Sequence, residues 1–125
     1  MSGYNIVTTG ATPLIAGSGA VANASAVATL TGTPTTTVYL SGFTISGSGA
    51  TTALPVSVTV AGLLGGSQIY AYNFALGATI GNTPLVVAFN PPLPASAINT
   101  AISVTCPASG TGGTKNTVVA TGFYI

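Results

Sequence analysis

Apolar and polar residues alternate along much of the chain, which is the pattern of β-strands. The clearest cases are residues 56–60, where three valines alternate with Ser57 and Thr59, and residues 69–74, where three aromatic side chains fall on one face. Alternation with a period of two indicates a strand that is buried on one side. No stretch keeps a helical period, and Gly and Pro recur at short intervals, so the chain is predicted to be β throughout.

Turn-forming residues divide the rest of the chain into further short strands. These are predicted at residues 4–9, 38–45, 85–89, 102–106 and 117–125. Altogether we expect about eight strands with turns about every 8–12 residues, which is typical of a sandwich or jelly roll. The predicted fold is therefore all-β: a jelly-roll-like antiparallel β-sandwich, built as a single domain over residues 1–125.

Three local features refine this prediction. Gly42 interrupts the strand at 38–45 and predicts a bulge or a close approach of another backbone. Residues 85–89 are apolar on both faces, which predicts either a central strand or one that a partner covers. Residues 90–94 contain three prolines, which lack an N–H donor, so the sheet is expected to end there.

The N-terminal residues 1–36 differ in composition from the rest of the chain. Residues 11–36 are low in complexity and rich in Ala, Gly and Thr. Because small side chains allow close approach of backbones, this segment is predicted to be an extended arm, or one or two flat strands, packed on a neighbouring subunit. The apolar pair Leu14 and Ile15 is expected to anchor it, and residues 37–125 are expected to form the sandwich core.

The chain carries one charged side chain, that of Lys115, and contains no Asp, Glu, Arg or His. It therefore has no side-chain carboxylates for acid–base catalysis and no histidine to activate a nucleophile. Apart from the single Cys106, the side chains that zinc, calcium and magnesium prefer as ligands are missing as well, so no site for these ions can be built from them. One lysine is too few cations to neutralise phosphates. We expect a protein that is not an enzyme, with no cofactor, no metal and no nucleic acid partner.

Two residues remain as candidates for reactive chemistry. Cys106 shares a face with Ile102 and Val104, so it is expected to be a buried, unreactive thiol. Lys115 follows a run of Gly and Thr in the predicted loop at 109–116, where it is expected to be solvated. Its expected role is that of a charge that discourages edge-to-edge aggregation.

The low charge favours a subunit that packs against other subunits. A net charge of +1 is small for a free domain, and charged residues are depleted at the cores of interfaces. The alternative is a soluble monomer hydrated by its Thr, Ser and Asn side chains. The candidate interface consists of apolar and aromatic residues: Tyr39, Phe43, Tyr70, Tyr72, Phe74, Leu14 and Ile15. Cross-strand packing in the core is the alternative explanation for the aromatic members.

No targeting or membrane segment is expected. No apolar run reaches the length of roughly 18 residues at which a transmembrane helix becomes a candidate. The first residues also lack the basic region and apolar stretch of a secretory signal. The chain is therefore predicted to be made in the cytoplasm, where it is used or from which it leaves by a route without a cleaved signal, and to have no membrane partner.

Three segments after residue 37 follow one another in a recognisable order: VYLSGFTISGSGA, VTVAGLLGGSQIYAYNF and PLPASAINTAISVTCPA, with a Gly-aromatic end at residues 121–125. In style and order, residues 38–125 resemble small virion structural proteins of tailed bacteriophages. The resemblance implies a capsid cement, or decoration, protein with a β-sandwich fold on the virion surface. It also implies a homotrimer whose partners are the capsid protein and itself.

Two other functions fit the same composition. One is a glycan-binding sandwich that would stack sugar rings on Tyr39, Tyr70 or Tyr72. The other is a fibre or filament subunit, which would associate into open polymers rather than a closed oligomer.

Overall fold

The computed structural model describes residues 10–50, 54–75, 77, 82–110 and 115–125, with only the backbone of Leu54. Within them the chain forms nine strands and no helix. The strands are β1 (Thr12–Gly17), β2 (Val21–Ala22), β3 (Ala26–Leu30), β4 (Val38–Ser48), β5 (Leu54–Ala61), β6 (Gln68–Phe74), β7 (Leu85–Pro94), β8 (Ile102–Cys106) and β9 (Lys115–Tyr124). The strand predicted at residues 4–9 lies outside the described residues.

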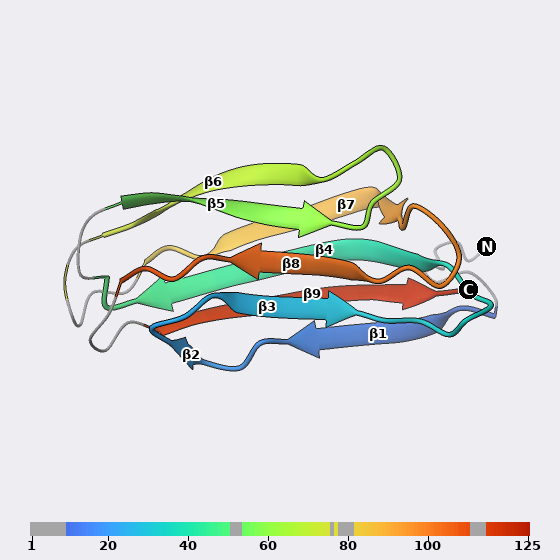
Figure 1. The fold of residues 1–125 in the computed structure, drawn as a ribbon, viewed down its shortest axis with the longest axis horizontal. Coiled ribbons are helices and arrows are strands. Elements are labelled where there is room, and N and C mark those ends of the chain that lie inside the picture. The colour runs from blue at the N-terminus through green and yellow to red at the C-terminus, as the bar shows by residue number, and fades with distance from the viewer. Residues whose placement is uncertain (1–9, 51–53, 76, 78–81, 111–114) are drawn as a thin grey trace, which may run out of the picture.

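The strands form two antiparallel sheets that pack face to face (Figure 1). The first sheet has the order β1-β9-β4-β7, with β2 added beside β9, and the second has the order β3-β8-β5-β6. Among the described strands, β5 and β6 are the only consecutive pair that hydrogen-bond to each other; most other connections cross between the sheets. Interleaving of this kind is the jelly-roll arrangement, so the predicted fold class is confirmed.

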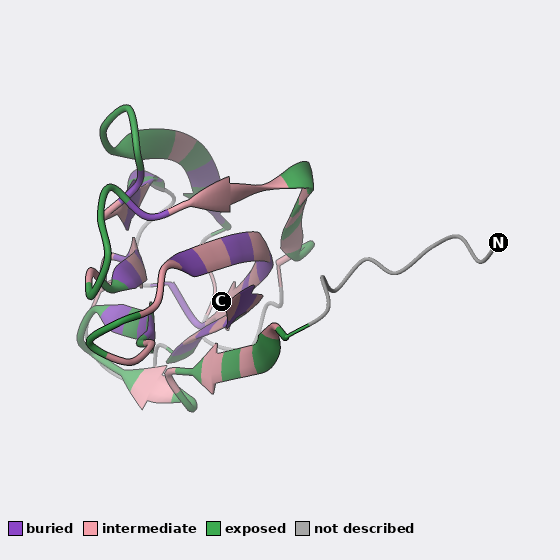
Figure 2. Ribbon diagram, turned by 90° about the vertical axis from the view of Figure 1, so that its right-hand side faces the viewer, coloured by how far each residue is buried: buried purple, intermediate pink, exposed green. Residues whose placement is uncertain are grey.

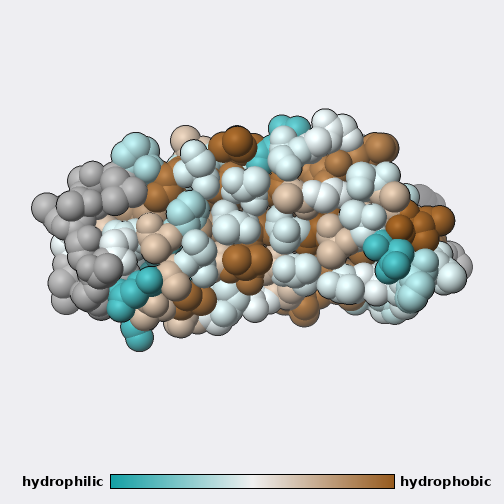
Figure 3. Space-filling view, in the orientation of Figure 1, coloured by the Kyte–Doolittle hydropathy of each residue, from teal (hydrophilic) through white to brown (hydrophobic). Residues whose placement is uncertain are grey.

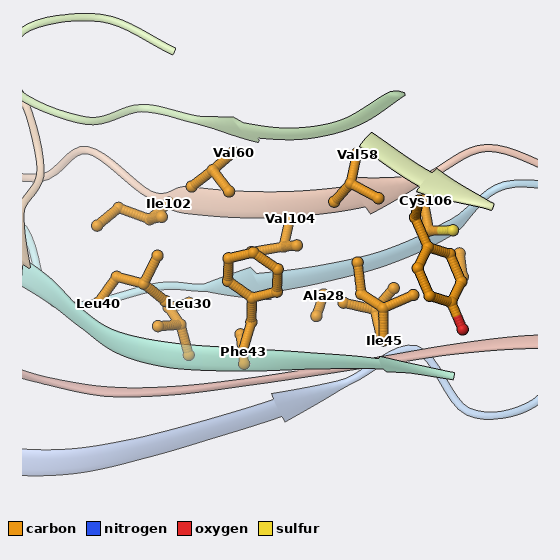
Figure 4. Packing of buried hydrophobic residues seen from close by; sticks show 14 of the residues in the cluster. Ala28, Leu30, Leu40, Phe43, Ile45, Val58, Val60, Ile102, Val104 and Cys106 are labelled. Carbon is orange, nitrogen blue, oxygen red and sulfur yellow. The ribbon is translucent and has the colours of Figure 1, made fainter. Parts of the chain in front are cut away.

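The core lies between the inner faces of the two sheets, and buried and exposed residues alternate along most strands (Figure 2). Phe43 and Ile45 of β4 point toward the second sheet, where Val104 of β8 and Val58 of β5 face them (Figure 4). Ile45, Val58 and Val104 are fully buried. Burial of each such side chain contributes about 1.5–3 kcal/mol, so these inner faces hold the sheets together.

Strand β4 contains the bulge that Gly42 predicts. Leu40 pairs with Gly122 and Gly42 pairs with Thr121, so Ser41 is an extra residue on β4. The backbones also approach closely here, since a Cβ added at Gly42 would lie 2.5 Å from the carbonyl oxygen of Val87. The extra residue shifts the alternation of faces by one position along β4.

The prediction of a separate arm over residues 1–36 is wrong for its described part. Strands β1 and β2 pair with β9, and β3 pairs with β8, so this segment belongs to both sheets of the same chain. Ala26, Ala28 and Leu30 are buried in the core. Ala26 and Ala28 contribute small side chains to the core, whereas Leu30 is one of the largest side chains that are fully buried.

The prediction that the sheet ends at residues 90–94 is also wrong. Strand β7 continues to Pro94, and Leu93 and Pro94 pair with Leu40 and Tyr39. Within the described residues β7 pairs only with β4, so it forms one edge of the first sheet. Proline is tolerated at an edge because its missing N–H can lie on the side that pairs with no strand.

Neutral polar side chains hold the chain where many proteins use ion pairs. Buried Asn116 donates from Nδ2 to the carbonyl oxygen of Pro107 at 2.9 Å and accepts from Ser109 at 3.2 Å. Asn82 donates from Nδ2 to the carbonyl oxygen of Gly47 at 3.1 Å. No buried side-chain nitrogen or oxygen in the described part of the chain lacks a partner. The polar groups are thus satisfied without charge.

Candidate functional site

Three of the predicted interface residues lie in the core. Phe43, Tyr72 and Phe74 are 3 %, 8 % and 1 % exposed. Tyr72 and Phe74 pack edge to face with ring centroids 5.0 Å apart, and Phe43 meets half-buried Tyr70 of the opposite sheet at 5.4 Å. These rings join the two sheets, so cross-sheet packing accounts for them and they offer little surface to a partner.

Neither the Tyr72 hydroxyl of this cluster nor the Cys106 thiol is available for chemistry with a ligand. The Tyr72 hydroxyl donates to the carbonyl oxygen of Thr83 at 2.9 Å, and burial raises its pKa, with a smaller contribution from Cys106. Cys106 is fully buried, as predicted, and burial raises its pKa to about 11. A thiol with a raised pKa stays protonated near neutral pH and is a poor nucleophile. Tyr72 is accordingly not placed to stack on a sugar.

The remaining candidates divide between the two sides of the first sheet. Leu14 points inward and packs against the core, whereas its neighbour Ile15 points outward and is 76 % exposed. Tyr39 lies on the same outer face as Ile15 and stacks on Phe123 of β9, with ring centroids 4.9 Å apart and planes at 12°. Two of the seven predicted residues, Ile15 and Tyr39, therefore lie on the same outer face.

This surface is the outer face of the first sheet. Three rows of paired residues cross it from β7 through β4 and β9 to β1: Val86, Thr44, Val119 and Gly17; Ala88, Gly42, Thr121 and Ile15; Pro94, Tyr39, Phe123 and Pro13. No member of these rows carries a charge, and Val86 is 69 % exposed. The rows combine exposed aliphatic residues with half-buried Tyr39, which stacks on the buried Phe123 (7 % exposed), and interface cores are rich in aliphatic and aromatic residues of this kind.

The outer face of the second sheet is different. Its rows contain mainly hydroxyl and methyl side chains: Val27, Thr105, Thr59 and Ile69; Thr29, Ser103 and Ala61; Ser57 and Ala71. Figure 3 shows it as a pale surface on which strongly hydrophobic residues are isolated. Single exposed apolar residues are common on protein surfaces, so this face indicates no partner by itself.

Lys115 is exposed, as predicted, but its position differs from the expected loop. It is the first residue of β9 and pairs with Ser48 of β4 and Ala22 of β2. Because β9 lies inside the first sheet, Lys115 is not on an edge strand, where a charge would discourage aggregation. Lys115 is in phase with Val119 along β9, so it lies on the outer face of the first sheet, at the end of the strand and outside the three uncharged rows.

Val86 belongs to this surface but is not among the predicted interface residues. The signal was present in the sequence, because residues 85–89 are apolar on both faces. The structure excludes a central position for this strand among the described residues, since β7 is an edge strand. Its inner residues Leu85, Val87 and Phe89 pack on the core, while Val86 and Ala88 stay exposed.

The described residues contain no group of three His, Cys, Asp or Glu side chains that could hold a metal ion. No helix in that part of the chain is long and apolar enough to cross a membrane. Comparison of the chain with protein-family models, with curated proteins and with solved structures gave no match.

Proposed function

We propose that this protein is a structural virion protein that decorates an assembled capsid shell and has no catalytic role. The observation that carries the proposal is the set of three uncharged rows on the outer face of the first sheet, in which Ile15 and Val86 are 76 % and 69 % exposed. Protein interfaces bury surfaces of this composition at their cores. In this proposal the chain is made in the host cytoplasm and works on the capsid surface.

The sequence of β7 and its position at the sheet edge favour a partner on this face. Its apolar residues on both sides have two explanations, a central position in the sheet or cover from another protein. Among the described strands β7 is at the edge, and Val86 and Ala88 remain exposed. The proposal adopts the second explanation, cover by another protein.

Physical chemistry indicates how such binding would strengthen a shell. Complete burial of one Val or Ile side chain contributes about 1.5–3 kcal/mol, and the three uncharged rows have no ions to desolvate. A protein that binds the assembled shell but not its free subunits stabilises the assembly by mass action. Decoration of this kind needs contact area and no reactive group.

Co-sedimentation with assembled capsids that lack this protein tests the proposal. The test variant carries Ile15→Lys and Val86→Lys on the outer face of the first sheet. The matched control carries Val27→Lys and Ser57→Lys, which add the same charge at exposed positions on the second sheet. All four positions point away from the core, so both variants are expected to fold.

The wild-type chain and the control should saturate the capsid at the same stoichiometry. The Ile15→Lys/Val86→Lys variant should bind at least about tenfold more weakly, because each buried charge costs more than about 1 kcal/mol. Failure of the wild-type chain to bind capsids would refute the decoration function. Equal loss of binding by both variants would refute the assignment of the face.

A further inference from the structure

Strand β6 forms one edge of the second sheet. It pairs with β5 on one side, and among the described residues no strand pairs with its other side. In Figure 1 it runs along the upper margin of the molecule. An exposed edge presents a row of backbone N–H and C=O groups to any strand that can align with it.

Pro55 of β5 determines which groups of β6 face outward. Pro55 pairs with Asn73, and a directly hydrogen-bonded antiparallel pair needs an N–H from both residues. Because proline has none, this must be a non-hydrogen-bonded pair, and the N–H and C=O of Asn73 point away from β5. Because the direction of the backbone groups alternates along a strand, the N–H and C=O groups of Ile69 and Ala71 also point away from β5.

A hydrogen bond in the loop after β6 is consistent with this alternation of backbone direction. Ala75 is the next residue in the outward series, and its N–H donates to Oδ1 of Asn82 at 2.8 Å. A loop side chain thus takes the place of a neighbouring strand at the end of β6. Along β6 itself the outward groups at positions 69, 71 and 73 have no such neighbour among the described residues.

The edge of β6 lacks the features that usually prevent pairing. It contains no charge and no proline, and its register with β5 runs without a shift from Gln68 to Phe74. In contrast, β7 contains three prolines and β1 contains Pro13. Strand β3 is also free of proline and charge but is shorter, with 5 residues against 7 in β6. Of the four edges, β6 is therefore the best template for another strand.

We propose that β6 pairs with β6 of a second copy of this chain, antiparallel and across a two-fold axis at Ala71. This register aligns Ala71 with Ala71 of the second copy, and Ile69 with Asn73 of the second copy. All the aligned residues have outward N–H and C=O groups, so each pair forms two hydrogen bonds. The two second sheets then become one continuous sheet.

Three observations favour a second copy as the occupant. The strand carries no charge, so identical strands do not repel each other. Ala71 has a small side chain, which fits at the axis where a residue meets itself. On the inner side, Tyr70 is placed beside Tyr72 of the second copy, which extends the aromatic packing of the core. A two-fold dimer also differs from the homotrimer that the resemblance to phage proteins implies.

Disulfide cross-linking tests the register directly. In a hydrogen-bonded antiparallel pair the Cα atoms are about 5.5 Å apart, which is within disulfide range. Ala71→Cys should form a dimer on mild oxidation. The control, Ser57→Cys, is exposed on the same face and pairs with Ala71 one strand further in, so it should not cross-link. Native Cys106 is buried and does not interfere. Absence of cross-linking at position 71, or equal cross-linking at both positions, would overturn the proposal.

Charge at the axis provides a second test. Ala71→Lys places two ammonium groups opposite each other in the dimer and should raise its dissociation constant by about fivefold or more in analytical ultracentrifugation. Ser57→Lys should change the constant by less than about twofold. Equal effects of the two variants would overturn the pairing. Capsid binding involves the other sheet, so failure here is distinguishable from failure of the decoration function.

Discussion

Tyr39 and Phe43 are both aromatic, lie on the same strand and are four residues apart, yet they face opposite sides of the first sheet. Tyr39 precedes the bulge of β4 and stacks on Phe123 on the outer face. Phe43 follows the bulge and packs on Tyr70 between the sheets. One inserted residue therefore separates an aromatic side chain for the core from one for the surface. Substitutions on the two sides of the sheet should therefore differ in their effect on stability.

The largest difference is expected between alanine substitutions at these two positions. Phe43→Ala should lower the free energy of unfolding by about 3–5 kcal/mol, because it leaves a cavity between the sheets. Tyr39→Ala should cost only about 1 kcal/mol, since it mainly removes the stack with Phe123. Urea unfolding of both variants measures the two values. Equal losses would show that the bulge does not separate inside from outside.

A smaller effect is expected at the glycine opposite the bulge. A Cβ at Gly122 would collide with the carbonyl oxygen of Tyr39, so Gly122→Ala should cost about 1–3 kcal/mol. Gly17 is the control, because a Cβ there meets no atom closer than 3.8 Å. Gly17→Ala should change the free energy of unfolding by no more than about 0.5 kcal/mol. Tolerance of Gly122→Ala in the same urea assay would contradict the close approach.

The buried thiol of Cys106 should make the stability of the fold depend on pH in the alkaline range. The pKa of Cys106 is raised from 9.0 to about 11, so the folded state keeps a proton that the unfolded state releases between these values. Stability should therefore be constant from about pH 4 to 7 and should fall as pH rises above about 9. Cys106→Ala should be less stable overall but should lose less stability over the alkaline range. A fall in stability between pH 4 and 7 would contradict this prediction.

The smallest effect is expected from salt and from the single lysine. The chain has no side-chain ion pair for salt to screen, and Lys115 is exposed. Lys115→Ala, or a change from about 0.05 to about 0.5 M sodium chloride, should shift the free energy of unfolding by less than about 0.5 kcal/mol. A larger loss in Lys115→Ala would reveal an interaction of the lysine that exposure does not suggest.

The fold class could be predicted because it depends on alternation and on turn spacing, both of which are visible in the sequence. Strand β8 matches its predicted residues 102–106, and the bulge follows from Gly42. The N-terminal strands could not be placed, because in β3 the inner residues are the small Ala26 and Ala28 while the outer residue Val27 is larger. The hydrophobic pattern of β3 therefore does not indicate which side of the strand faces the core.

The candidate surface was only partly predictable for a related reason. Strand β7 has apolar residues on both faces, and only its position at the sheet edge shows that Val86 is uncovered. Tyr39 and Phe43 would share a face in a regular strand, and the sequence does not indicate how the bulge divides them. Edge positions and bulge phases depend on contacts between distant strands, which local patterns do not contain.

The mass of the purified chain in solution tests most directly whether the uncharged surfaces serve assembly. Light scattering coupled to size-exclusion chromatography, from about pH 4 to 8 and over a range of salt, measures it. We predict a discrete species of twice the 12.0 kDa chain mass, or a larger even multiple, that pH and salt do not change. A monomer of 12.0 kDa at every accessible concentration would contradict assembly of the free chain through β6, whereas capsid binding by the first sheet is tested by co-sedimentation.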